Sequence, residues 1–191
     1  ALDPQGPGIS KIVKEHYNPI ILKIRNLEKP VIAAVNGVAA GAGANIALAC
    51  DIVFAGRSAS FIQAFSKIGL VPDSGGTYTL PRLLGMQLAS ALMITGDKLS
   101  AEDARSFGMV YRVFEDVQLL EQSVHQATAI AAMPTKAIGL TKRLLNQTYS
   151  NTLDLQLNAE HDLQVASASG YDYQEGVKAF LEKRKPVFKG E

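Results

Sequence analysis

The sequence contains one cysteine, no tryptophan and no long apolar run, and each of these scarcities excludes something. A single cysteine, Cys50, cannot form a disulfide within the chain, which favours a reducing, cytoplasmic compartment, and we expect it to pack as a small side chain. No apolar run approaches the roughly 20 residues that a membrane-spanning helix needs, so we expect no membrane partner. Residues 1–10 lack the charged and apolar regions of a signal peptide, and we expect them to form a flexible loop.

The charge is balanced, with 19 Lys and Arg residues against 18 Asp and Glu residues. The densest basic run, residues 183–185, is short and lies beside Glu182. Nucleic-acid binding needs a clustered basic face, so we expect no nucleic-acid partner. The three histidines show no spacing typical of a metal site, and we expect no metal: His16, His125 and His161.

Hydrophobic periodicity predicts an α/β core near the N-terminus. Apolar residues at helical spacing predict a helix over residues 11–27, with a kink or a break at Pro19. The continuous apolar run 31–35 predicts a strand that is buried on both faces. A second apolar run, 52–55, and a helical segment, 45–50, complete a βαβ unit.

Local signals predict the elements that follow this unit. Gly85 separates two predicted helices, residues 77–84 and 87–95, and Ser100 resembles the start of a capping box. A short strand is predicted over residues 108–114. Only helices are predicted afterwards, over residues 117–132, 134–147, 150–168 and 173–183. We therefore divide the sequence into an α/β core, residues 1–115, and a helical region, residues 116–191.

The segment 41–45 (GAGAN) lies between a predicted buried strand and a predicted helix. Small residues let the backbone approach a ligand closely, and the first N–H groups of a helix are free donors. The two features together suit an oxyanion hole for a thioester carbonyl. Small residues would equally permit tight packing of the helix on the sheet, and the local pattern leaves both interpretations open.

The segment 71–76 (VPDSGG) places a carboxylate, Asp73, in a glycine-containing loop before a predicted helix. A carboxylate held in a loop can act as a general base. An aspartate at this spacing can also be the N-cap of the following helix, and the local pattern alone favours the cap. Ser74 does not resemble an activated nucleophile, because the G-x-S-x-G pattern is absent.

Several segments resemble, in order, the enoyl-CoA hydratase/isomerase (crotonase) family. They are residues 29–44 (KPVIAAVNGVAAGAGA), 48–52 (LACDI), 69–77 (GLVPDSGGT), 80–83 (LPRL), 96–105 (GDKLSAEDAR), 108–110 (GMV) and 180–185 (FLEKRK). The resemblance covers essentially the whole chain. It implies a crotonase-like core of ββα spiral turns, a C-terminal helical region for trimerisation, and a homotrimer or a dimer of trimers.

The resemblance also implies a substrate and two hydrogen-bond donors. Members bind acyl-CoA thioesters, so coenzyme A enters as part of the substrate and no separate cofactor is expected. One enolate-stabilising N–H maps onto Ala42, between Gly41 and Gly43. The other lies in an upstream motif near F-x-A-G-x-D, and we expect the sequence to begin after that motif and to be incomplete. Phe180 and Lys183 match the pair that contacts the adenine and phosphates of CoA.

Two positions depart from the pattern of the hydratases. Those enzymes carry one catalytic glutamate where this chain has Asn45 and another where it has Phe65. Adding water to a double bond needs both a base and an acid, so the departures argue against hydratase activity. Isomerases of the bacterial phenylacetate pathway resemble this chain at Pro-Asp-Ser-Gly-Gly, with an aspartate that acts alone. One base suffices to move a proton between two carbons.

We therefore predict an acyl-CoA isomerase in which Asp73 is the base and Ala42 supplies an oxyanion donor. The predicted substrate is an enoyl-CoA or the ring epoxide of phenylacetyl-CoA. The other residues predicted to line the acyl and oxyanion sites are Gly41, Gly43, Phe61, Phe65, Ile68, Leu70 and Gly76. The alternatives are an enoyl-CoA hydratase and a non-catalytic CoA-binding or assembly subunit. An aromatic-CoA dehalogenase would also use a tryptophan, which this sequence lacks.

Overall fold

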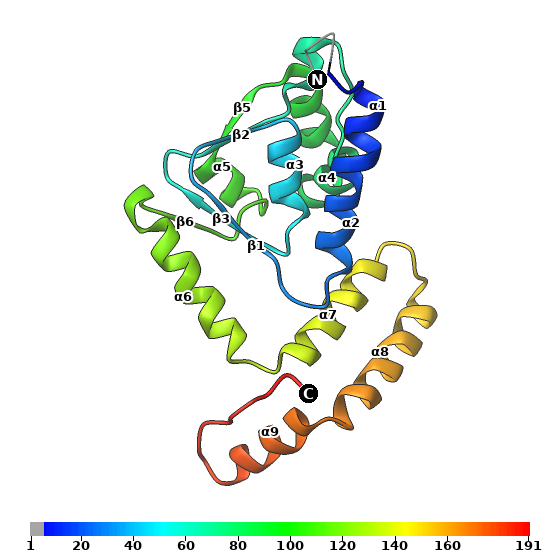
Figure 1. Ribbon diagram of the computed structural model, residues 1–191, viewed down its shortest axis with the longest axis vertical. Coiled ribbons are helices and arrows are strands. Elements are labelled where there is room, and N and C mark those ends of the chain that lie inside the picture. The colour runs from blue at the N-terminus through cyan, green and yellow to red at the C-terminus, as the bar shows by residue number, and fades with distance from the viewer. Residues whose placement is uncertain (1–5) are drawn as a thin grey trace. The chain divides into compact units, whose positions relative to one another are not determined.

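The computed structural model describes residues 6–191 (Figure 1). We expected a loop over residues 1–10. Its first five residues lie outside the described part of the chain, and the first helix already begins at Ile9. The chain forms two compact units. The first comprises its residues up to Arg25 together with residues 31–123, and the second comprises residues 26–30 and 124–191.

Two three-stranded sheets build the first unit, and the first four strands alternate between them. One sheet has the order β1–β3–β6 with parallel neighbours, and the other has the order β2–β4–β5. Within the second sheet β2 and β4 are parallel, whereas β4 and β5 are antiparallel. The strands are β1 (Ile32–Val35), β2 (Val38–Ala40), β3 (Ile52–Gly56), β4 (Ser60–Ile62), β5 (Lys98–Ser100) and β6 (Arg112–Phe114). Each pair β1–β2 and β3–β4 precedes a helix, which agrees with the predicted ββα turns.

The prediction for the first βαβ unit was right in outline and wrong in three details. β1 is only partly buried, with Ala34 exposed, because in the described part of the chain it lies at one end of its sheet and pairs with β3 alone. The more deeply buried strand is β3. The short strand β2 was not predicted. The helix α3 (Ala42–Ala49) begins three residues before the predicted position 45, since Gly41 takes a positive φ of 53° and starts the helix directly after β2.

The N-terminal helix runs through Pro19 instead of breaking there. It consists of α1 (Ile9–Lys11), a π-helical segment η1 (Ile12–Tyr17) and α2 (Asn18–Asn26). At the junction the N–H of Asn18 donates to the carbonyl of Val13, five residues back. The widened π turn directly before Pro19 accommodates a residue that lacks an N–H and would crowd the carbonyl of an ordinary helical turn.

The helices of the first unit pack against the sheets and against each other. α3 contacts β1, β2 and α4 (Gly76–Thr95), and Figure 1 shows these helices on one side of the strands. Gly85 adopts φ 74° and ψ 163° inside α4, so the predicted separation of two helices at this residue is confirmed. Buried side chains from both sheets and these helices form one core, which includes Leu48, Val53, Phe61, Leu80, Leu99 and Met109.

The later helices follow the sequence predictions closely, whereas the strand predicted over residues 108–114 is confined to β6, its last three residues. Ser100 caps α5 (Ala101–Ser106), and its hydroxyl accepts from the N–H of Asp103 at 3.1 Å. The remaining elements are η2 (Ala64–Ile68), η3 (Asp116–Gln118), α6 (Leu119–Ala131), α7 (Thr135–Gln147), α8 (Leu153–Ala168) and α9 (Tyr171–Leu181). Among the described residues, none of these helices combines the length and apolarity that a membrane crossing requires.

Candidate active site

The N-terminus of α3 has the features expected of an oxyanion site. The N–H of Gly41 donates to the carbonyl of Ile62 at 2.8 Å, which joins the start of α3 to the end of β4. No side chain among the described residues caps this helix end. The N–H groups of the first helical turn have no partner within the helix, so that of Ala42 is available to a ligand.

Phe65 covers one side of this turn. A Cβ atom at Gly41 would lie 3.5 Å from Cζ of the Phe65 ring, so the ring packs directly on the glycine backbone. A Cβ atom at Gly43, in contrast, would meet no atom within 4 Å. The position where a hydratase would hold a glutamate is therefore occupied by a buried aromatic ring beside the helix start.

The loop that carries Asp73 is sharply turned. Ser74 and Gly75 both adopt positive φ angles, 51° and 74°, and α4 begins at Gly76. The N-cap of α4 is Gly75, and no side chain within the described residues caps the helix, so the interpretation of Asp73 as a cap is wrong. Ser74 and Gly75, both left-handed, separate Asp73 from the first residue of α4. The half-buried Asp73 carboxylate therefore makes no capping hydrogen bond to α4.

Asp73 is fixed at both its backbone and its side chain. Its carbonyl accepts from Nδ2 of Asn45 at 2.9 Å and from the N–H of Gly76 at 2.9 Å. Its Oδ1 accepts from the hydroxyl of the buried Ser74 at 2.9 Å. Within residues 6–191 its Oδ2 makes no hydrogen bond. The role of Asp73 as a base stays a prediction.

The sequence indicated Asn45 only as a missing acid and did not indicate Gln63 at all. Gln63 Nε2 donates to Oδ1 of Asn45 at 2.8 Å, so a chain of buried amides leads from the end of β4 to the Asp73 carbonyl. A polar side chain directly after a buried strand was the available signal for Gln63. We call Asn45, Gln63, Asp73, Ser74 and Gly76 the Asp73 cluster.

The residues predicted to line the acyl pocket have different surroundings. Phe61 belongs to the hydrophobic core of the first unit and is 4% exposed. Phe65 is also buried, against Gly41. Ile68 and Leu70 are 63% and 40% exposed. Of these four, Phe65 has the contacts with the oxyanion turn, and contact of the others with an acyl group stays a prediction.

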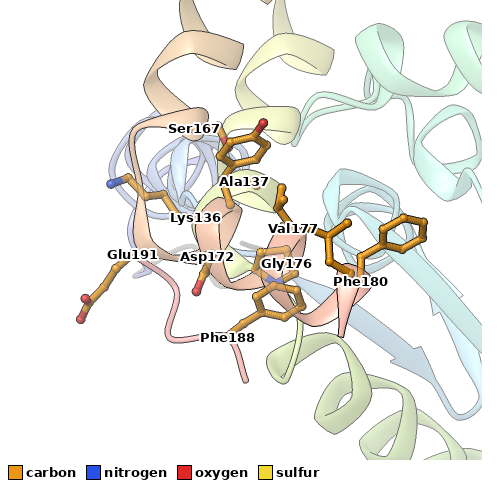
Figure 2. Close-up of a pocket in the computed structure, with 12 residues that line it drawn as sticks. Lys136, Ala137, Ser167, Asp172, Gly176, Val177, Phe180, Phe188 and Glu191 are labelled. Atoms are coloured by element: carbon orange, nitrogen blue, oxygen red, sulfur yellow. The ribbon is translucent and has the colours of Figure 1, made fainter. Parts of the chain in front are cut away.

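The two predicted CoA contacts lie in the second unit. Phe180 is on α9, is 82% exposed and lines a cavity of about 420 Å³ between α7, α9 and the C-terminal tail (Figure 2). Phe188 of that tail lies against α9 at Gly176. Lys183 follows α9 and has a positive φ of 55°, which is uncommon for a residue with a side chain. Both residues are exposed, and their contact with CoA stays a prediction.

Two acidic residues of α9 hold the C-terminal tail. Asp172 accepts from the N–H groups of Lys189 and Gly190, at 2.7 and 2.8 Å. Glu175 accepts from Arg184 and from the N–H of Val187 at 2.8 Å. The hydrogen bond from Arg184, followed by that from Val187, lowers the pKa of Glu175 to about 2. In the described part of the chain, no three His, Cys, Asp or Glu side chains cluster as a metal site would require.

Comparison with known proteins identifies the family. The residue pattern of the enoyl-CoA hydratase/isomerase family matches residues 4–191. The chain belongs to this family. It is 48% identical to the 1,2-epoxyphenylacetyl-CoA isomerase of Escherichia coli K12, over 99% of this chain and 73% of that protein. It is 38% identical to a mitochondrial enoyl-CoA hydratase of Pongo abelii, over 87% of this chain and 57% of that protein.

Solved structures support the same assignment. The crystal structure of an enoyl-CoA hydratase from Polaromonas sp. JS666 superimposes with a TM-score of 0.92, at 38% identity, over 97% of this chain and 72% of that chain. The predicted crotonase-like fold is therefore confirmed, and the protein is a member of a family of enzymes that act on acyl-CoA thioesters. Isomerases and hydratases both occur among the similar proteins.

Proposed function

We propose that the protein is an acyl-CoA isomerase that moves a proton along the acyl group through a thioester enolate. The observation that carries the proposal is the carboxylate pattern around the start of α3. Asn45 and Phe65 stand where the resemblance to hydratases would place glutamates, and both are buried in structural contacts. The Asp73 cluster has one carboxylate, that of Asp73, and one of its oxygens carries no hydrogen bond within the described residues.

The proposed reaction needs one base and one anion site. The carboxylate of Asp73 takes a proton from a carbon of the acyl group, and the electrons of the broken C–H bond move into an enolate. The negative charge develops on the thioester oxygen, which accepts from the N–H of Ala42. The protonated Asp73 then returns the proton to a different carbon as the carbonyl re-forms. Hydration would in addition need a group to activate water.

The similarity to an epoxyphenylacetyl-CoA isomerase and the aromatic ring of Phe65 favour an aromatic acyl group. We therefore propose the ring epoxide of phenylacetyl-CoA as a substrate, with a 3-enoyl-CoA as a simpler one. The buried Phe65 ring makes the side of the Gly41 turn apolar, and apolar surroundings suit an aromatic ring better than a polar chain.

The test compares the protein with its Asp73→Asn and Asp97→Asn variants. Asp97 is an exposed aspartate outside the Asp73 cluster and is the matched control. We expect Asp73→Asn to lower kcat for isomerisation of both substrates by about 10²- to 10⁴-fold, and Asp97→Asn to leave it unchanged. Unaltered isomerisation by Asp73→Asn would refute the proposal. Hydration of crotonyl-CoA that survives Asp73→Asn would favour a hydratase, and CoA binding without any turnover would favour a non-catalytic subunit.

A further inference from the structure

Asn45 is placed to hold the Asp73 loop rather than to react. Its side chain is fully buried, at 0% exposure, so it cannot touch a substrate. Its Nδ2 donates to the main-chain carbonyl of Asp73 at 2.9 Å, and its Oδ1 accepts from Gln63 at 2.8 Å. The Asp73 carbonyl can only accept, so it fixes which way the amide of Asn45 points, and Asn45 in turn fixes the amide of Gln63.

Asn45 joins the Asp73 loop to the helix that carries Ala42, because its side chain contacts the loop and its backbone belongs to the helix. The N–H of Asn45 donates to the carbonyl of Gly41 at 3.1 Å, which is the first turn of α3. Ala42 lies within that turn. The bond from Asn45 to the Asp73 carbonyl therefore sets how far the carboxylate loop lies from the start of α3, where the N–H of Ala42 is available.

The surroundings leave room for this amide and for little else. A Cβ atom at Gly76 would lie 2.7 Å from Cγ and 2.8 Å from Oδ1 of Asn45. Ser74, only 2% exposed, adopts a left-handed conformation that residues with a side chain rarely take, and its hydroxyl donates to the Asp73 carboxylate. A strained residue of this kind persists when its neighbours hold it in place, and the Asn45 bond to the adjacent residue does so.

We propose that Asn45 is a positioning residue for the isomerisation, which orients the Asp73 base relative to the Ala42 donor through the Asp73 main chain. The position that holds an acid in the hydratase pattern thus serves here to align a base that lies elsewhere. The inference rests on the proposed function, because it presumes that Asp73 is the base. It assigns no proton transfer to Asn45.

The experiment measures kcat and KM for a 3-enoyl-CoA with Asn45→Asp, Asn45→Ala and the control Asn158→Ala. Asn45→Asp keeps the size of the side chain and its acceptor for Gln63 but removes the donor to Asp73. Asn158 is an exposed residue of α8 and leaves kcat unchanged when replaced. Displacing a catalytic group by about 1 Å can cost about 10²-fold in rate. We expect both Asn45 variants to lose about 10- to 100-fold in kcat with KM within about twofold.

A double variant separates positioning from general structural damage. If Asn45 acts through Asp73, then Asn45→Ala adds no further loss to the residual rate of Asp73→Asn, since the group that it positions is already gone. Losses that multiply in the double variant, or an unchanged kcat in Asn45→Asp, would overturn the proposal. Should Asn45→Ala not fold, as judged by its thermal unfolding, the isosteric Asn45→Asp still decides. Full activity of Asp73→Asn would instead refute the proposed function itself.

Discussion

Two segments without regular structure, one in each unit, are held by buried side chains. In one segment the side chain donates the hydrogen bond, and in the other the side chains accept it. The Asp73 loop of the first unit is held by an amide, because Asn45 donates to a main-chain carbonyl. The C-terminal tail of the second unit is held by carboxylates, because Asp172 and Glu175 accept from main-chain N–H groups. An amide does not titrate between pH 2 and 10, whereas a carboxylate does.

The difference suits the part that each segment plays. If the loop carries the base, its geometry must stay the same while Asp73 gains and loses a proton, and a neutral donor provides this. The tail has no proposed chemical step, so its attachment can depend on charge. Charge-assisted hydrogen bonds such as those of Arg184 to Glu175 are stronger than neutral ones, but they weaken when the carboxylate is protonated.

Of the changes that test this comparison, the largest effect is expected from disturbing the neutral attachment without changing any hydrogen-bonding group. In Gly76→Ala the new Cβ would lie 2.7 Å from Cγ of the buried Asn45, so the amide must move. We expect kcat for isomerisation to fall about 100-fold. In the control Gly37→Ala the new Cβ meets no atom within 4 Å, and kcat stays unchanged. Full activity of Gly76→Ala would show that the amide can shift without affecting Asp73.

The second prediction concerns the charged attachment. The hydrogen bonds from Arg184 and Val187 hold the folded-state pKa of Glu175 at about 2, below its ordinary value of 4.5. A depressed carboxyl pKa contributes stability that is fully present above the unfolded value and is lost as the pH falls from about 4.5 towards 2. We expect Glu175→Gln to lower Tm at pH 7 and to flatten the pH dependence of Tm in this window.

The exposed Glu160 on α8 provides the control for this measurement. Glu160→Gln should preserve both the Tm at pH 7 and its decline below pH 4.5. If Glu175→Gln shows the same acid-induced decline as the unmodified protein, the tail is not held by the charge of Glu175, and the contrast between the two segments fails.

The smallest expected effects come from the two helix caps, one in each unit. Ser100 accepts from the N–H of Asp103 at the start of α5, and Thr152 accepts from the N–H of Leu155 at the start of α8. We expect Ser100→Ala and Thr152→Ala each to lower the free energy of unfolding by about 1 kcal/mol, measured in urea. If the units unfold together, both variants shift one transition. Separate transitions, each shifted by one variant only, would show that the units unfold independently.

The sequence predicted those features that depend on a few neighbouring residues. The strand at 52–55, the interruption at Gly85 and the cap at Ser100 each follow from local composition, and all three are confirmed. The strand β2 was missed because three small residues carry little periodicity and its partner β4 lies about 20 residues away. The π turn before Pro19 was missed because sequence patterns indicate that proline disturbs a helix, not how the helix adapts.

The candidate site divides in the same way. The resemblance to the family, applied to residues 42, 45, 65 and 73, implied an anion site, two absent acids and one base. Local rules assigned Asp73 to the helix cap, because they could not show that Ser74 and Gly75 would both turn left-handed and move the cap to Gly75. The contact between Asn45 and the Asp73 carbonyl spans 28 residues, so it depends on tertiary packing that local patterns do not encode.

The packing of Gly76 against Asn45 has an evolutionary consequence. A side chain at position 76 and a long side chain at position 45 would compete for the same volume, since a Cβ at one lies within van der Waals overlap of the other. The effects of substitutions at the two sites should therefore be epistatic. A mutational path that introduces a long acidic side chain at position 45 must keep residue 76 as glycine, and a path that enlarges residue 76 must first shorten residue 45. The order in which the two positions can change is therefore constrained by the methyl group that Gly76 lacks.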